Sequence, residues 1–264
     1  MTLTKLGLAI GLPDLQEVWL VDAKTLQLRK RIPVGSMTGL TGSPMMTKAY
    51  APDREDALTV IDLEAGKVVA RRRGSEFHLP DGMPGVRRQG ESPGFRFATI
   101  TPDGKYLMTG GENLNRMRIE GDDFVYEEAG PGIGQNPQRL EVSPDSLYVA
   151  MPSGGGNGRV PNQTEPGPYN TFVYRIGDLR TPIIVISSGA YPRAMTFDKA
   201  AGYIYAQNFG SALIAFSPDG LKVKSFRLGF KQGGETQQFL LHPAGKRVLV
   251  SAGNSVVWLD MSMQ

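Results

Sequence analysis

The fold is indicated by two stretches that share one pattern, VWLVDAKTLQLRKRIPVG at Val18–Gly35 and LTVIDLEAGKVVARRRG at Leu58–Gly74. Each contains a strand-like run ending in an acidic corner, a short turn, a second strand-like run and a glycine. The pattern returns more loosely at Phe172–Gly189 and Leu213–Gly229. A period of about forty residues built from short strands is typical of a β-propeller, whose repeats are four-stranded antiparallel blades. The sequence therefore predicts an all-β propeller.

The turns between the strands support this prediction. The segment Thr101–Gly104 (TPDG) separates the apolar run Arg96–Ile100 from the run Tyr106–Thr109. Proline presets φ at the first corner, aspartate accepts hydrogen bonds from nearby amides, and glycine tolerates positive φ. The same chemistry recurs at Ser143–Ser146 and, in degenerate form, at His242–Gly245.

Counting strands a, b, c and d from the axis outward gives six blades in one domain that spans residues 1–264. We expect incomplete blades at the two ends, with strands b, c and d in 1–35 and strands a, b and c in 230–264. In the first of these, Thr4–Ile10 is predicted as a single strand. A truncated seven-bladed ring is the alternative. The four complete blades are expected at 36–74, 92–130, 135–189 and 190–229.

These motifs also resemble a bacterial propeller repeat, the YVTN type, which is related to WD40-like repeats. The resemblance rests on Thr101–Gly104 with Tyr106, on Val18–Asp22 and Leu58–Asp62, and on Ile32–Gly35 (IPVG). It covers nearly the whole chain, but each motif marks the fold and not an activity. The resemblance implies a scaffold, in a family whose members range from binding modules to heme and lactone enzymes.

Composition excludes several classes of site and partner. The chain has no cysteine, so disulfides, thiolate metal sites and cysteine nucleophiles are excluded, and it has only two histidines, too few for a multi-histidine metal site. There are 29 basic and 26 acidic residues, spread without clustering, which argues against a nucleic-acid partner.

No part of the sequence predicts a membrane span, because no apolar run approaches the roughly 18 residues that a spanning helix requires. The apolar stretch Leu6–Leu12 follows Lys5, but it is short for a signal sequence and lacks a small-residue cleavage site. We interpret it as a strand, so the chain shows no convincing signal peptide. The compartment stays open, as does the question of whether Met1 is the native start or the chain is a module of a larger protein.

Strand parity indicates where a site would lie. Strand direction alternates, so the connections from b to c lie on the same face as those from d to the next a, and we call this the long-loop face. It contains two long irregular segments, Ser75–Glu91 and Pro152–Asn170, and also Asp53–Glu55. Loops longer than about 12 to 15 residues usually bind a ligand or are disordered. We predict a binding surface on this face made from eight residues: His78, Asp81, Arg87, Arg88, Asn157, Arg159, Asn162 and Tyr169. The alternative is that these segments are solvated loops.

The sequence favours a non-catalytic scaffold that binds a protein or peptide partner at the long-loop face. We assign no catalytic residue, cofactor or metal ligand. The alternative is a hydrolase or lyase that acts on a small sugar or lactone at the axial mouth. It would use a divalent cation, which prefers oxygen ligands. Asp53, Glu55, Asn136 and Asn208 are the candidates for such ligands.

The triplet Arg71–Arg73 lies on a predicted outermost strand. An anion-binding patch is one interpretation. We favour another, in which exposed charges keep the unpaired edge of the strand from pairing with other edges.

Overall fold

The computed structural model divides into two units, Met1–Pro131 and Gly132–Gln264, which are described separately. Its secondary structure is almost entirely β: the helices among the described residues are two short 3₁₀ helices, Pro13–Leu15 and Gly74–Glu76. Neither has the length or apolar character needed to cross a membrane. The structure describes residues 1–78, 94–95, 97–110, 113–132, 140–152, 170–187, 194–197, 204–207, 212–216, 223–227, 239–241, 247–252 and 255–260.

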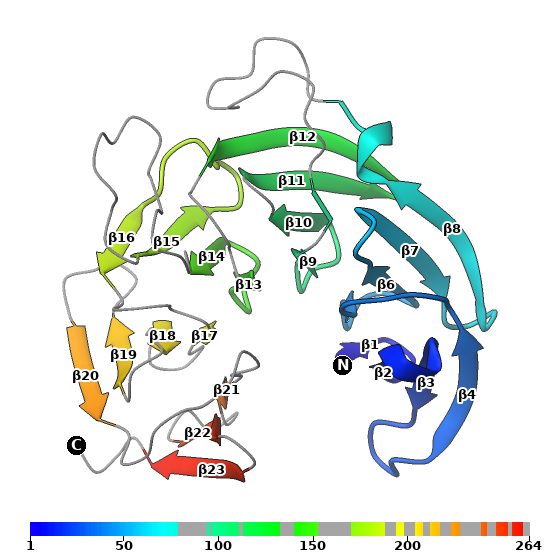
Figure 1. Cartoon of the computed structure of the whole chain (residues 1–264), viewed down its shortest axis with the longest axis horizontal. Helices are drawn as coiled ribbons and strands as arrows, with labels where there is room; N and C mark the ends of the chain where they lie inside the picture. The colour runs from blue at the N-terminus through cyan, green and yellow to red at the C-terminus, as the bar shows by residue number, and fades with distance from the viewer. Residues whose placement is uncertain are drawn as a thin grey trace. The chain divides into compact units, whose positions relative to one another are not determined.

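The first unit contains three four-stranded antiparallel sheets, in which strands that follow one another in the chain are neighbours. First strands β1, β5 and β9 contact one another in turn, and the outer strands β4 and β8 are also in contact (Figure 1). The strands are β1 (Thr2–Thr4), β2 (Gly7–Leu12), β3 (Glu17–Val21), β4 (Leu28–Pro33), β5 (Thr41–Gly42), β6 (Lys48–Pro52), β7 (Ala57–Asp62), β8 (Lys67–Arg73), β9 (Phe97–Ile100), β10 (Tyr106–Gly110), β11 (Asn113–Glu120) and β12 (Asp123–Gly132).

The second unit has the same hairpin order in two four-stranded sheets, β13 to β16 and β17 to β20, and in a three-stranded sheet, β21 to β23. Within the described residues the last sheet therefore has the three strands that the sequence predicts. The strands are β13 (Glu141–Val142), β14 (Tyr148–Pro152), β15 (Asn170–Arg175), β16 (Ile184–Ser187), β17 (Ala194–Phe197), β18 (Ile204–Gln207), β19 (Ala212–Phe216), β20 (Val223–Arg227), β21 (Phe239–Leu241), β22 (Arg247–Ala252) and β23 (Ser255–Asp260).

The first sheet differs from its prediction, because it has four strands and not three. The chain turns after Thr4, and β2 begins at Gly7, so the predicted strand Thr4–Ile10 is two antiparallel strands. Gly7 has a φ of 138°, and a Cβ added there would lie 2.4 Å from the carbonyl oxygen of Val21. Only glycine fits this backbone. The expected incomplete first blade was therefore wrong.

The turn chemistry is confirmed where it was predicted. The Thr101 hydroxyl donates to Asp103 Oδ1 (2.6 Å) and accepts from the amide of Tyr106 (3.0 Å). Gly104 has a φ of 75°, as the turn requires. In the second unit the Ser143 hydroxyl donates to Asp145 in the same way (2.5 Å).

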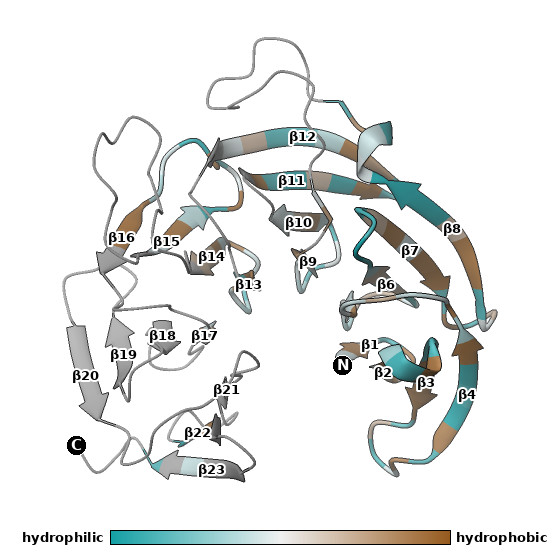
Figure 2. Ribbon diagram, in the orientation of Figure 1, coloured by the Kyte–Doolittle hydropathy of each residue, from teal (hydrophilic) through white to brown (hydrophobic). Residues whose placement is uncertain are grey.

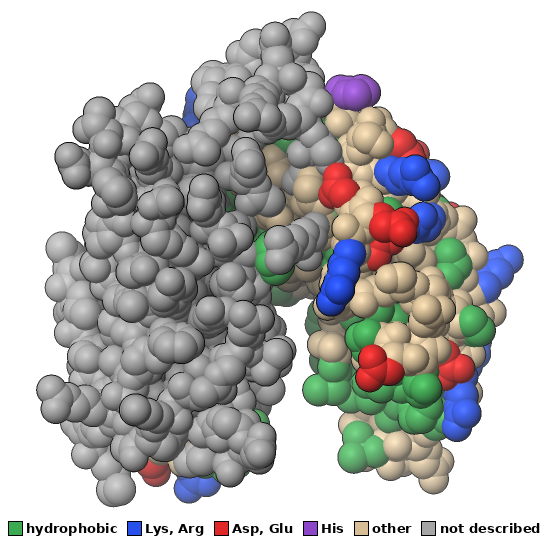
Figure 3. All heavy atoms as spheres, viewed as in Figure 1, with side chains coloured by type: hydrophobic (Ala, Val, Ile, Leu, Met, Phe, Trp, Pro, Cys, Tyr) green, Lys and Arg blue, Asp and Glu red, His purple; other side chains and the backbone are tan. Residues whose placement is uncertain are grey.

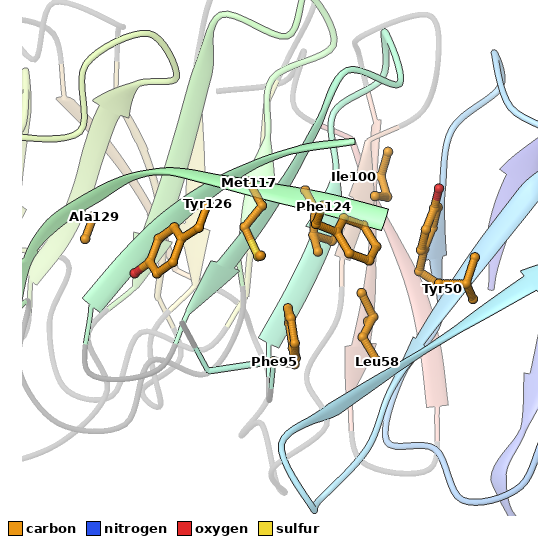
Figure 4. Close-up of a cluster of buried hydrophobic side chains, with 10 residues drawn as sticks. Tyr50, Leu58, Phe95, Ile100, Met117, Phe124, Tyr126 and Ala129 are labelled. Atoms are coloured by element: carbon orange, nitrogen blue, oxygen red, sulfur yellow. The ribbon is translucent and has the colours of Figure 1, made fainter. Parts of the chain in front are cut away.

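Buried side chains from neighbouring sheets form the core of the first unit. Between the second and third sheets, Tyr50 and Leu58 pack against Phe95, Met117 and Phe124 (Figure 4). The rings of Tyr50 and Phe124 meet edge to face, with centroids 5.7 Å apart. Full burial of such a side chain contributes about 1.5 to 3 kcal/mol. Figure 2 shows hydrophobic residues along β7 and a hydrophilic end to the outer strand β8.

Candidate functional site

The connections at one end of the strands in the first unit are hydrogen-bonded to each other, as strand parity predicts. The amide of Val34, which follows β4, donates to the carbonyl of Gln16 between β2 and β3 (2.9 Å). In the next sheet the amide of Gly74, which follows β8, donates to the carbonyl of Asp56 between β6 and β7 (2.8 Å). The described part of the long-loop face in this unit therefore includes Pro13–Gln16, Asp53–Asp56 and Gly74–His78, together with the connection that begins at Val34.

The turns at the other strand ends form a second face, which we call the short-turn face. It includes Lys5–Leu6, Asp22–Gln27, Ser43–Thr47 and Thr101–Lys105. Here neighbouring sheets are joined directly: the amide of Lys5 donates to the carbonyl of Met46 (2.9 Å), and the Ser43 hydroxyl donates to the carbonyl of Pro102 (2.6 Å).

Asp53 determines the shape of the long-loop face at the second sheet. Its side chain is buried, and its Oδ1 accepts hydrogen bonds from the amides of Glu55 (2.8 Å) and Ala57 (3.0 Å). Its Oδ2 accepts a hydrogen bond from Nη2 of Arg71 on β8 (2.6 Å). Burial raises the pKa of Asp53, but the hydrogen bonds from Arg71 and the two amides outweigh it and hold that pKa below its ordinary value. Asp53 is therefore a charged support for the turn.

The residues next to Asp53 are exposed. Arg54 and Glu55 both point to solvent, and the side chain of Glu55 is 70% exposed whereas that of Asp53 is 1% exposed. Nη2 of Arg71 also lies 2.9 Å from Glu55 Oε2, so one guanidinium bridges the buried and the exposed carboxylates. The turn presents a cation and an anion side by side on a fixed backbone.

Asp56 has a role that the sequence analysis missed. It adopts a φ of 55°, and its Oδ1 accepts a hydrogen bond from the amide of Phe95 (2.6 Å), just before β9. The carbonyl of Asp56 also accepts a hydrogen bond from the amide of Gly74. Asp56 therefore holds both the beginning and the end of the connection from β8 to β9. The only sequence signal was an aspartate at a turn position, a residue that tolerates left-handed backbone.

His78 is exposed at the start of the first long segment, and Figure 3 shows a histidine at the surface of the first unit. The residue before it, Phe77, packs edge to face on Phe95 and Phe124, with centroids 5.8 Å and 6.2 Å away. The core therefore anchors the backbone immediately before His78. The other seven predicted site residues lie outside the described residues: Asp81, Arg87, Arg88, Asn157, Arg159, Asn162 and Tyr169.

Of the four candidate cation ligands, two lie within the described residues and two outside them. Asp53 and Glu55 accept hydrogen bonds from Arg71, and Asn136 and Asn208 lie outside the described residues. In the described ranges no three His, Asp or Glu side chains form a group that could hold a metal ion.

The sheets and their hairpin order define the class of fold, and a comparison with solved structures agrees with it. No family model matches the sequence, and no curated protein matches it. Among solved structures the chain resembles hydrazine synthase of Kuenenia stuttgartiensis, with a TM-score of 0.71 and 17% sequence identity over 98% of this chain and 75% of that one. At this identity the likeness concerns the fold alone. The predicted all-β propeller of four-stranded antiparallel blades is confirmed, and the number of blades stays a prediction.

Proposed function

We propose that the chain is a non-catalytic propeller scaffold that binds a protein or peptide partner through its long-loop face. The observation that carries this proposal is the turn between β6 and β7, where buried Asp53 fixes a backbone that presents Arg54 and Glu55 to solvent. A backbone that is already fixed loses little further entropy on binding, which favours recognition of a partner.

The neighbouring connection adds a second exposed group to this surface. Asp56 ties the turn to Gly74 and Phe95, and the ring of Phe77 is packed on Phe95, so His78 follows a segment that is fixed by the core. Arg54, Glu55 and His78 supply charged and polar groups of the kinds that recognise peptide backbones and side chains.

The alternative of a hydrolase or lyase with a divalent cation at the axial mouth has less support. Two of its four candidate oxygen ligands, Asp53 and Glu55, are hydrogen-bonded to Arg71, and a cation would have to displace that guanidinium. Repulsion between the cation and Arg71 opposes binding there.

Peptide selection tests the proposal. Ligands are selected from a random displayed peptide library against the whole chain, and their dissociation constants are measured by fluorescence anisotropy. Replacing Arg54, Glu55 and His78 together with alanine should weaken binding at least about tenfold, because these exposed groups would contact the peptide. The matched control replaces exposed Lys5, Lys24 and Lys105 of the short-turn face with alanine, and we expect it to bind as the unaltered chain does.

Two results would contradict the proposal that the long-loop face binds the partner. If the short-turn variant loses binding and the long-loop variant keeps it, the partner surface is on the other face. A selection that yields no peptide whose affinity depends on Arg54, Glu55 or His78 would also count against it.

A further inference from the structure

The outer strands of the first two sheets are strongly basic. In β4 three of the six residues are Lys or Arg (Arg29–Arg31), and in β8 four of the seven are (Lys67 and Arg71–Arg73), while neither strand contains Asp or Glu. We call these two strands the basic margin. Figure 3 shows Lys and Arg side chains along this outer side of the first unit.

The two strands lie next to each other, which the sequence did not reveal. β4 contacts β8, and Nζ of Lys30 on β4 donates to the carbonyl of Glu64 in the turn that precedes β8. Two basic segments that are about forty residues apart in sequence therefore lie in neighbouring outer strands.

Part of this charge is compensated within the protein. Arg29 pairs with Asp22, Arg71 with Asp53 and Glu55, and Arg72 with Asp123 at 3.2 Å. The other basic groups of the margin form no ion pair with a carboxylate of the described residues. Lys30 bonds a carbonyl, and Arg31 lies over the ring of Trp19 at 4.8 Å. Lys67 and Arg73 are both exposed. The margin thus retains positive charge that is open to solvent.

The backbone of the margin is also open to pairing. β4 and β8 each come last in the strand order of their sheets, so one edge of each has no neighbouring strand among the described residues. An extended peptide can add to such an edge through main-chain hydrogen bonds. The uncompensated cations Lys67 and Arg73 would repel another basic edge and attract an acidic strand. Val68 of β8 is 38% exposed and adds an apolar contact beside the charges.

We infer that the basic margin binds an acidic, extended segment of a partner protein, which pairs with the edge of β8 and places its carboxylates against Lys67 and Arg73. This surface adjoins the long-loop face, because Arg71 pairs with Glu55, but the residues proposed to contact the acidic segment, Lys67 and Arg73, are not those proposed to bind at the long-loop face. Its occupant is defined by two properties together, negative charge and a backbone free to form β pairing.

The probe is a fluorescein-labelled peptide of about eight residues, an ordinary strand length, in which pairs of Glu alternate with single Val. It presents carboxylates on both faces, because the register shift at Val60 and Ile61 places Lys67 and Arg73 on opposite faces of β8. Its binding to the whole chain is followed by fluorescence anisotropy.

Lys67→Glu with Arg73→Glu should weaken binding at least about tenfold, because two attractions become repulsions. The control pair, Lys5→Glu with Lys24→Glu, makes the same charge change on the short-turn face and should alter affinity less than about twofold. Lys67→Gln with Arg73→Gln should fall between them, and circular dichroism checks that each variant is folded.

Three outcomes would overturn this inference. The first is the absence of binding up to about 1 mM peptide, a level at which even weak specific contacts are measurable. The second is equal loss of binding in the two charge-reversal pairs. The third is equally tight binding of inorganic polyphosphate or of the same peptide with methylated backbone amides, which would identify a general anion surface. A double variant, Arg54→Ala with His78→Ala, leaves the pairing of Glu55 with Arg71 intact and should bind the acidic probe normally, so failure of one proposal is distinguishable from failure of the other.

Discussion

The two faces of the first unit differ in the range of the contacts that fix their turns. On the short-turn face the aspartates act within a few residues: Asp22 accepts hydrogen bonds from the amides of Lys24 and Thr25, and Asp103 accepts from the hydroxyl of Thr101. On the long-loop face, Asp53 is held by Arg71, which is 18 positions away. The aspartate turns of the short-turn face are held by local contacts, whereas the turn at Asp53 adds to its local amide bonds a partner on an outer strand.

This difference determines how far away in sequence a substitution can be and still disturb an aspartate turn. A local turn forms from its own sequence, so it is robust to changes elsewhere in the sheet. The contact between Asp53 and Arg71 requires that β8 pair with β7 so that Arg71 lies opposite Thr59, after an irregular step in register at Val60 and Ile61. We therefore expect the structure of the long-loop face to be sensitive to distant substitutions.

The largest effect is expected for Asp53→Ala. The buried carboxylate accepts hydrogen bonds from two amides and from Arg71, and its removal leaves the buried amide of Ala57 without that acceptor. The free energy of unfolding should fall by about 3 kcal/mol, as for other lost hydrogen bonds to buried charged groups. Urea unfolding followed by circular dichroism measures the change.

Glu55→Ala is the matched control for Asp53→Ala. Its carboxylate also pairs with Arg71, but it is exposed, so the expected loss is below about 1 kcal/mol. Equal losses in the two variants would show that Arg71 and not the buried carboxylate stabilises the turn, and the contrast between local and distant contacts would then fail.

A smaller effect is expected for Ser43→Ala, which sharpens the comparison because Ser43 makes a distant contact on the short-turn face. Its buried hydroxyl donates to the carbonyl of Pro102 in the next sheet (2.6 Å) and accepts from the amide of Met45 (3.1 Å). Loss of both bonds should lower the free energy of unfolding by about 1 to 2 kcal/mol in the same measurement. Exposed Ser36 is the control, and Ser36→Ala should be neutral. Comparable losses at both serines would argue that the bond to Pro102 contributes nothing specific.

Much of the fold could be predicted because its signals are local. The TPDG turn, the apolar runs and the acidic corner of each hairpin all lie within short windows, and the faces follow from strand parity without any distance information. The prediction failed at Thr4–Ile10 for a physical reason. The apolar pattern there looks continuous, and the turn depends on a backbone at Gly7 that only its close approach to the carbonyl of Val21 reveals.

The site was less predictable because its supports are distant in sequence. Asp53 was placed on the correct face, but its burial and its pairing with Arg71 depend on the register of β8. Asp56 was missed because its partner, the amide of Phe95, is 39 residues away. The pairing of β4 with β8 into a basic margin likewise follows from the packing of neighbouring sheets. Sequence patterns give the strands of each sheet, whereas contacts between sheets require the structure.

The smallest effect concerns Asp22, where the contacts are local. Hydrogen bonds from the amides of Thr25 and Lys24 lower the pKa of Asp22 to about 2, and Arg29 is a lesser cause. A carboxyl whose pKa is lower in the folded state stabilises the fold above its unfolded pKa of about 3.8, and this contribution is lost as the pH falls towards 2. Carboxyl carbon NMR titration measures the pKa directly. In Arg29→Ala the pKa of Asp22 should stay well below its ordinary value, because the two amides remain. If the pKa instead returned to its ordinary value, the side chain of Arg29 and not the turn would set the charge, and the short-turn face would depend on its outer strand as the long-loop face does.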